Sequence, residues 1–215
     1  LTGLRGVGKT VLLDAFKPLA MQAGWIWTTA DLSESMSMTE ENLAIRLLSD
    51  LAVITSQIIP VTIHKQRVGF GAQVETTTAP LSYSLLKQQY DSSPGLVSDK
   101  LKATLEFIWP LIQNLGIRGI VFAYDEAQNL ADHSNNGQYP LSMLLDVFQS
   151  IQRKGMRFIL ALTGLPTLFP KLVEARTFAE RMFRVLSLNS LTEQASIQAI
   201  LNPIRSAAPP ICHSF

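Results

Sequence analysis

Apolar residues recur along the chain with two different spacings, and segments of the two kinds alternate. Four segments have apolar residues every three or four positions, as one face of a helix requires: 10–23, 39–54, 96–114 and 140–153. Between and after them lie short runs of β-forming or apolar residues: 25–31, 119–124, 158–162 and 185–188. Strands that alternate with helices of this length favour right-handed crossovers. They predict a mostly parallel sheet that is covered by helices on both faces, with the runs 119–124 and 158–162 fully buried.

Single residues indicate where the helices begin and end. Ser37 or Thr39 is expected to cap the second helix. Pro18 lies inside the first helix, where it removes a backbone hydrogen bond and is expected to kink or split the helix. A helix from Pro166 to residue 175 and a final helix from 192–194 to Pro203 are expected after the strand at 158–162.

The periodicity lapses between residues 57 and 95, and we interpret this stretch as a variable insertion between core elements. A hairpin over 61–74 is expected within it, with Gly69 and Gly71 near the turn. His64 is interpreted as a surface residue because no cysteine, histidine or acid lies nearby at the spacing of metal ligands. The predicted organisation is a core over 1–205, an irregular tail over 206–215, and no lid domain.

The segment Gly3–Thr10 reads Gly-Leu-Arg-Gly-Val-Gly-Lys-Thr and fits the P-loop pattern G-x-x-x-x-G-K-[ST]. Glycines let the backbone turn sharply around phosphate oxygens, Lys9 would contact the β- and γ-phosphates, and the Thr10 hydroxyl would bind Mg²⁺. The alternative is an ordinary glycine-rich turn before a helix. The predicted nucleotide-binding residues are Gly3, Leu4, Arg5, Gly6, Val7, Gly8, Lys9, Thr10 and Val11.

Two acids, Asp125 and Glu126, stand at the carboxyl end of the apolar run 119–124. Phosphoryl transfer needs an acid that holds the Mg²⁺ shell and a carboxylate that orients the attacking water, so Asp125 is the predicted metal residue and Glu126 the predicted catalytic one. The alternative is that both acids merely open the next helix, where negative charge suits the helix dipole. The P-loop upstream, in the expected strand order, favours the first interpretation.

Thr163 follows the next apolar run, and the carboxyl ends of adjacent parallel strands share one edge of a sheet. Its hydroxyl could meet the γ-phosphate or the attacking water as a sensor; the alternative is a turn residue that caps the helix at Pro166. Arg176, Arg181 and Arg184 precede the last strand. Arg181 is the preferred candidate for a finger that reaches a neighbouring subunit's γ-phosphate, and a solvated surface charge is the alternative.

Composition narrows the protein class. The 215 residues are 47% hydrophobic and 16% charged, which indicates a globular chain. The net charge of +1 does not indicate nucleic acid as a partner, and no apolar run approaches the roughly 18–20 residues of a membrane span. Cys212, the single cysteine, excludes an internal disulfide framework and fits a reducing compartment, so a cytoplasmic location is expected.

Four segments together resemble an AAA-type ATPase domain of the origin-recognition-like and STAND group: Gly3–Thr10, Tyr-Asp-Glu-Ala-Gln-Asn-Leu at 124–130, Leu-Thr-Gly-Leu-Pro at 162–166, and Ala-Glu-Arg-Met-Phe at 179–183. The resemblance covers residues 1 to about 205 except the insertion. It implies an α/β fold, the three-layer αβα sandwich of P-loop NTPases. The mostly parallel sheet would have strand order 5-1-4-3-2, its first strand largely missing. It further implies Asp125 near the metal, Glu126 as the activating base and Thr163 as a sensor.

The expected function is therefore an ATP-binding domain that hydrolyses Mg-ATP and drives a conformational change in an attached or partner module. ATP is favoured over GTP because the guanine motif Asn-Lys-x-Asp does not occur in the sequence. Two alternatives remain open: a STAND-like nucleotide switch or scaffold with little turnover, and an origin-type DNA-binding ATPase. The expected cofactors are ATP and Mg²⁺, and the expected partners are a homo-oligomer or an effector domain beyond residue 215.

Overall fold

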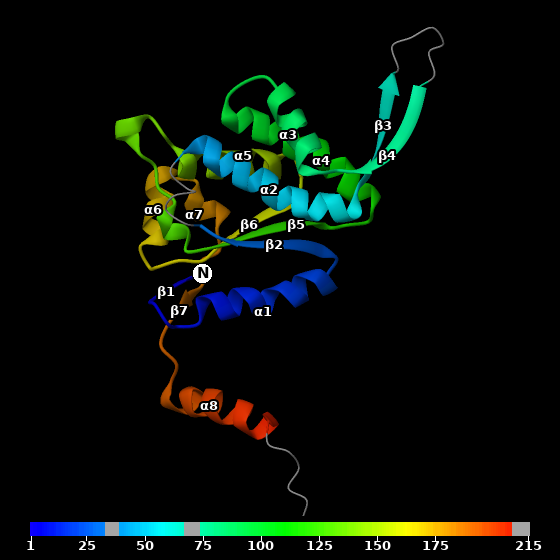
Figure 1. The fold of residues 1–215 in the computed structure, drawn as a ribbon. Helices are drawn as coiled ribbons and strands as arrows, with labels where there is room; N and C mark the ends of the chain where they lie inside the picture. The colour runs from blue at the N-terminus through cyan, green and yellow to red at the C-terminus, as the bar shows by residue number, and fades with distance from the viewer. Residues whose placement is uncertain (33–38, 67–73, 208–215) are drawn as a thin grey trace, which may run out of the picture.

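The computed structural model describes residues 1–32, 39–66 and 74–207 (Figure 1). Strands and helices alternate as the sequence pattern predicts. The elements, in chain order, are β1 (Thr2–Gly3), α1 (Lys9–Gln22), β2 (Trp25–Asp31), α2 (Glu40–Ile58), β3 (Pro60–Gln66), β4 (Val74–Pro80), α3 (Tyr83–Ser92), α4 (Val97–Asn114), β5 (Gly119–Asp125), η1 (Ala127–Asn129), η2 (Ser134–Asn136), α5 (Pro140–Arg153), β6 (Phe158–Leu162), α6 (Leu168–Ala175), α7 (Ala179–Met182), β7 (Ser187–Leu188) and α8 (Glu193–Ala207).

Parallel strands form the centre of the molecule. β2 pairs with β5 from Trp25 opposite Gly119 to Asp31 opposite Asp125, and β5 pairs with β6. β1 pairs with β7, also in parallel, and Thr2 forms a parallel bridge to Gly164 just after β6. The predicted α/β architecture with parallel strands is confirmed. All these strands run in the same direction, so their carboxyl ends meet at one edge.

The main core lies on one face of β5, whose seven residues are all buried. Helices α2, α4 and α5 cover that face, while α1 lies on the other (Figure 1). The ring of Phe122 on β5 meets Phe148 on α5 edge to face, with the ring centroids 5.4 Å apart. The apolar residues that give segment 140–153 its helical spacing are buried on α5: Leu141, Leu144, Leu145, Val147, Phe148 and Ile151.

The α1 face is less covered than the sequence predicts. α1 packs on β2, and Ile159 in the middle of β6 is left 41% exposed, so β6 is not buried on both sides. Val11 and Leu19, two of the apolar residues that give segment 10–23 its helical spacing, are exposed, whereas Leu13 is buried. Pro18 does not split α1, because the Asp14 carbonyl that loses its partner is on an exposed residue and can bind water.

The insertion has more structure than its weak periodicity predicts. β3 and β4 form an antiparallel hairpin from Pro60 opposite Pro80 to Gln66 opposite Val74, and it projects from the body (Figure 1). Its turn and the His64 side chain lie outside the described residues. The helix α3 was not expected. It forms because Leu86 and Tyr90 are buried against α2 and α4, and the Tyr90 hydroxyl donates to Glu41 at 3.0 Å.

Thr39, one of the two predicted caps, caps α2, and its hydroxyl accepts from the Asn42 N–H at 3.0 Å. Two other helix boundaries differ from the predictions. α6 begins at Leu168 rather than at Pro166. α8 continues past Pro203 to residue 207, because the unpaired carbonyl of Ala199 is on an exposed residue. Residues 206 and 207 of the tail predicted over 206–215 are therefore helical, and the rest of that tail lies outside the described residues.

Candidate functional site

The loop between β1 and α1 is held open by glycine conformations. Gly6 and Gly8 have φ angles of 81° and 87°, in the left-handed region that favours glycine. Gly8 is the N-cap of α1, so the helix begins at Lys9 and its first N–H groups point toward the loop. A Cβ on Gly3 would lie 2.7 Å from the Leu188 carbonyl oxygen, which leaves only glycine room beside β7.

Lys9 is buried, 7% exposed, and its ammonium lies inside the curve of the loop. The Nζ atom donates to the Gly3 carbonyl at 3.1 Å and to the Leu4 carbonyl at 2.9 Å. Beside it is a cavity of about 500 Å³ whose walls come from the loop and from the acid after β5. Its lining residues are Arg5, Gly6, Gly8, Lys9, Thr10, Val11 and Glu126. A positive charge and helix N–H groups therefore border one open space, an arrangement suited to an anion.

The carboxylate of Asp125 is the centre of a hydrogen-bonded cluster. Oδ2 accepts from the Thr10 hydroxyl, while Oδ1 accepts from the Thr163 hydroxyl and from the Glu126 N–H at 2.8 Å. Burial alone would raise the pKa of Asp125. The hydrogen bonds from Thr10, Thr163 and Glu126, with the charge of Lys9, outweigh burial and lower it below the ordinary value. Asp125 is therefore held in its ionised form.

Sheet topology explains why Thr163 reaches this cluster. Asp125 ends β5 and Leu162 ends the neighbouring β6, and the Thr163 N–H donates to the Tyr124 carbonyl at 2.9 Å. Thr163 is fully buried. Its hydroxyl is not a helix cap, because α6 begins after Thr167, so the capping interpretation of Thr163 is wrong.

Glu126 has an unusual backbone conformation. Its φ of 51° and ψ of 34° lie in the left-handed region of backbone conformation, and it is the one residue other than glycine with a positive φ among those described. Only a three-residue 3₁₀ turn, η1, follows it, so the two acids do not open an α-helix. The Glu126 side chain lines the cavity beside Lys9. Gln128 Nε2 donates to Glu126 Oε2, and the sequence pattern of segment 124–130 does not reveal this contact.

The three arginines have different surroundings. Arg176 forms a double hydrogen bond to Asp146, at 2.8 and 2.6 Å, and is held within the chain. Arg184 is exposed beside a small cavity under β1. Arg181 lies on α7 with an exposed side chain, and no hydrogen bond between described residues joins it to the Asp125 cluster. The structure thus brings Lys9, Thr10, Asp125, Glu126 and Thr163 together at the Gly3–Thr10 loop, and Arg181 is not among the described residues that line the cavity beside Lys9.

A second, larger cavity lies on the other side of the loop. Its volume is about 960 Å³, and it opens between the loop and the connection from β7 to α8. Its lining residues are 2–8, Pro166, 187–191 and Ser196. Sequence reasoning missed the contribution of 187–191, because nothing in the residue types of Ser187 to Leu191 marks a binding site.

The residues at the cluster suit a magnesium ion. No group of three or more His, Cys, Asp or Glu side chains gathers anywhere in the described part of the chain. Mg²⁺ does not need one, since it usually keeps several waters and binds through one or two carboxylates together with substrate phosphates. The Asp125 carboxylate and the Thr10 hydroxyl, already joined by a hydrogen bond, are hard oxygen donors of this kind.

The comparisons with known proteins bear on the fold. No family model and no curated protein sequence matches this chain. The structure is similar to that of the ORC2 protein of Aeropyrum pernix, determined as ADPNP–ADP complexes, with a TM-score of 0.52. This chain has the fold of the matched part of that protein. The match covers 95% of this chain and 45% of the ORC2 chain, at 18% sequence identity.

ORC2 is an AAA+ ATPase of the origin-recognition group, so the structural resemblance agrees with the one predicted from the four sequence segments. No helix among the described residues has the length and apolar character needed to cross a membrane.

Proposed function

We propose that this chain is an ATP-binding domain that hydrolyses Mg-ATP at the Gly3–Thr10 loop and so drives a conformational change in an attached or partner module. One observation carries the proposal: Thr10 and Thr163, on separate elements, both donate to the Asp125 carboxylate, beside a cavity that Lys9 and Glu126 line. These are the groups that phosphoryl transfer requires in one place.

Each group has a distinct role in the proposal. Lys9 would exchange the carbonyls of Gly3 and Leu4 for phosphate oxygens, and the N–H groups at the start of α1 would bind the same phosphates. Thr10 and Asp125 would hold Mg²⁺, which when bound offsets negative charge on the phosphate oxygens. Glu126 would orient the attacking water and accept its proton. Thr163, through its hydroxyl, would sense the γ-phosphate at the same edge.

The proposed sheet order is β7-β1-β6-β5-β2, the order 5-1-4-3-2 expected of the fold. The hydrogen bonds around Gly164 support it, because this residue joins β1 to the end of β6. The Gly3 N–H donates to the Gly164 carbonyl at 3.2 Å, and the Gly164 N–H donates to the Leu1 carbonyl at 3.0 Å. This order would place the loop over the edge where β5 and β6 end.

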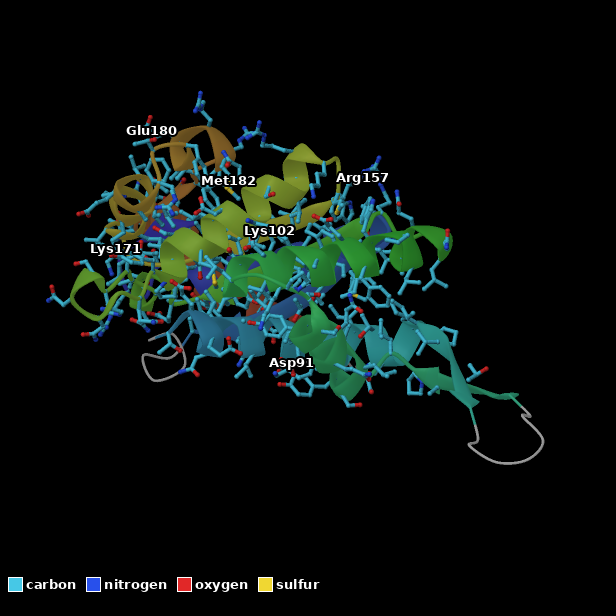
Figure 2. All side chains as sticks on the ribbon, turned by 90° about the horizontal axis from the view of Figure 1, so that it is seen from above. Asp91, Lys102, Arg157, Lys171, Glu180 and Met182 are labelled. Carbon is cyan, nitrogen blue, oxygen red and sulfur yellow. The ribbon has the colours of Figure 1, made fainter. Side chains whose placement is uncertain are left out.

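We also propose that Arg181 acts on the nucleotide of a neighbouring subunit in a homo-oligomer. Its exposed side chain supports this role. The position of α7 supports it as well, because α7 lies at the same end of the molecule as Lys171, and Arg157 lies at the opposite end (Figure 2). Arg157 precedes β6 and Lys171 follows it, so Lys171 marks the carboxyl ends of the strands.

The test is Mg-ATP turnover by the protein and by Glu126→Gln, with ATP binding measured for both. Glu174→Gln, the same chemical change on α6, is the control. Loss of turnover with retained binding in Glu126→Gln alone supports the proposal. If all three proteins bind ATP and none hydrolyses it, the chain is a nucleotide-dependent switch and Glu126 is not a working base. Absence of ATP binding overturns both functions.

A further inference from the structure

The side-chain amide of Gln128 joins Glu126 to the loop that follows β6. Its Nε2 donates to Glu126 Oε2, and its Oε1 accepts from the Leu165 N–H at 3.1 Å. An amide has a donor end and an acceptor end, and here each end has a different partner. The orientation of the amide is therefore fixed by the Leu165 N–H, which can only donate, so the end that faces Glu126 is the donor.

The turn that carries Gln128 is also fixed through its backbone. The Gln128 carbonyl accepts from Lys171 Nζ at 2.7 Å, and the Ala127 N–H donates to the Thr163 carbonyl at 2.9 Å. Lys171 lies on α6, at the end of the molecule opposite Arg157 in Figure 2. Two hydrogen bonds from outside η1 thus restrain the backbone from which the amide projects.

Gly164 makes the close approach possible. A Cβ at this position would lie 2.6 Å from Gln128 Oε1, closer than a real side chain could come. The backbone of Gly164 is hydrogen-bonded to Leu1 and Gly3 on its other side. One residue therefore contacts both the base of the Gly3–Thr10 loop and the amide that reaches Glu126.

We infer that Gln128 is a positioning residue for Glu126. This inference rests on the proposed ATPase function, in which Glu126 orients the attacking water. A glutamate side chain rotates freely about three bonds, and a donor on one carboxylate oxygen restricts that rotation. Gln128 holds Oε2 and leaves Oε1 for the water. Misplacement of a catalytic group by about 1 Å can lower a rate by about a hundredfold, so the restriction matters for turnover.

The first test compares Gln128→Met with Gln152→Met. Methionine keeps the length of the side chain and removes both ends of the amide. Gln152 donates to the Phe158 carbonyl at 2.8 Å, at the far end of β6, so its replacement removes a similar hydrogen bond outside the site. We expect kcat of Gln128→Met to fall about tenfold or more with ATP affinity within about twofold, and Gln152→Met to keep both. An unchanged kcat in Gln128→Met overturns the inference.

The second test uses the pH profile of Gln128→Glu. The introduced carboxyl still accepts from Leu165, and it can donate to Glu126 only when it is protonated. A neighbouring carboxylate favours the protonated form. Turnover of Gln128→Glu relative to the unaltered protein should therefore rise as the pH falls from about 8 to about 6. A ratio that is constant over this range indicates a merely structural role and overturns the inference.

The third test does not depend on turnover. The side-chain NH₂ signals of Gln128 in a ¹⁵N-labelled protein should move in Glu126→Ala and stay in place in Glu174→Ala. Unmoved signals in Glu126→Ala overturn the contact between Gln128 and Glu126 whatever the turnover. A protein that shows the contact but hydrolyses no ATP overturns the proposed function instead, so the two failures are distinguishable.

Discussion

Gly164 and the side-chain amide of Gln128 are packed so closely that a Cβ on Gly164 would lie 2.6 Å from Oε1. Gly164→Ala should therefore displace the amide from Glu126 and lower kcat about tenfold, while ATP still binds. Turnover assays and an ATP titration check this. Gln128→Ala should cause no further loss in the Gly164→Ala protein, because the displaced amide is already without effect; additive losses would contradict the prediction.

Lys9→Ala should abolish ATP binding. The Lys9 ammonium is held inside the loop by the carbonyls of Gly3 and Leu4, and alanine removes this charge from the place where the phosphates would bind. Calorimetric titration with Mg-ATP measures the loss. Lys17→Ala, an exposed lysine on the same helix, is the matched control and should bind normally. Unchanged affinity of Lys9→Ala for Mg-ATP would show that ATP does not bind at the Gly3–Thr10 loop.

Asp125→Asn should change how stability depends on pH. Because the native pKa of Asp125 is lowered, the native state binds this proton less readily than the unfolded chain does. The resulting stability is present above the ordinary value of 3.8 and is lost as the pH falls through the native pKa. Asparagine does not titrate. The deficit of Asp125→Asn, measured by urea unfolding, should therefore shrink between about pH 6 and about pH 3; a constant deficit would contradict this.

Tyr124→Phe should destabilise the fold by about 1–3 kcal/mol, because it takes a donor from a buried carboxylate. The Tyr124 hydroxyl donates to Asp50 Oδ2 at 2.8 Å, and both residues are buried. Burial raises the pKa of Asp50 despite the hydrogen bond and the charge of Arg46, so the stability that Asp50 contributes falls as the pH rises through the raised value.

The deficit of Tyr124→Phe should accordingly be larger at about pH 7 than at about pH 4, where the protonated form of Asp50 needs the donor less. Urea unfolding at both pH values measures it. Tyr139→Phe is the control. Tyr139 is 44% exposed, so its replacement should change the free energy of unfolding by no more than about 0.5 kcal/mol. A larger deficit at the lower pH would show that Asp50 is not the partner that matters.

Arg176→Ala should lower the stability of the fold, whereas Arg181→Ala should lower turnover. The Arg176 pair with Asp146 is partly exposed, so its loss should cost no more than about 1 kcal/mol in thermal or urea unfolding. Arg181→Ala should leave stability within about 0.5 kcal/mol. Its turnover should fall most at high protein concentration, where subunits meet. Equal losses at all concentrations would argue against action on a neighbouring subunit.

The order of strands and helices is predictable from the sequence because the buried face of each element leaves a pattern of apolar residues. β5 is buried along its whole length and α5 has one continuous apolar face, so both have patterns that exclude other structures. α3 could not be predicted in the same way. Its stability comes from Leu86 and Tyr90 packing on helices that are distant in sequence, and no local pattern reveals such contacts.

The residue types of the candidate site and the edge at which they meet were also predictable from the sequence. Lys9, Thr10 and Asp125 belong to patterns with a known chemical reason, and the parallel pairing of β5 with β6 brings Thr163 to Asp125. The role of Gln128 depends on the direction of one amide, and the neighbouring N–H of Leu165 sets that direction. Such a contact between a turn and a distant loop becomes visible only in three dimensions.

The left-handed backbone conformation of Glu126 lowers the stability of the fold, while the side chain at this position is the one proposed to act in turnover. A side chain in this region costs on the order of 1–3 kcal/mol, and glycine would relieve the cost. Glycine would also remove the carboxylate from the cavity. Selection for stability alone would therefore erase this glutamate, whereas selection for turnover would retain it. Among related sequences, the residue at this position should distinguish domains that still hydrolyse nucleotide from those that only bind it.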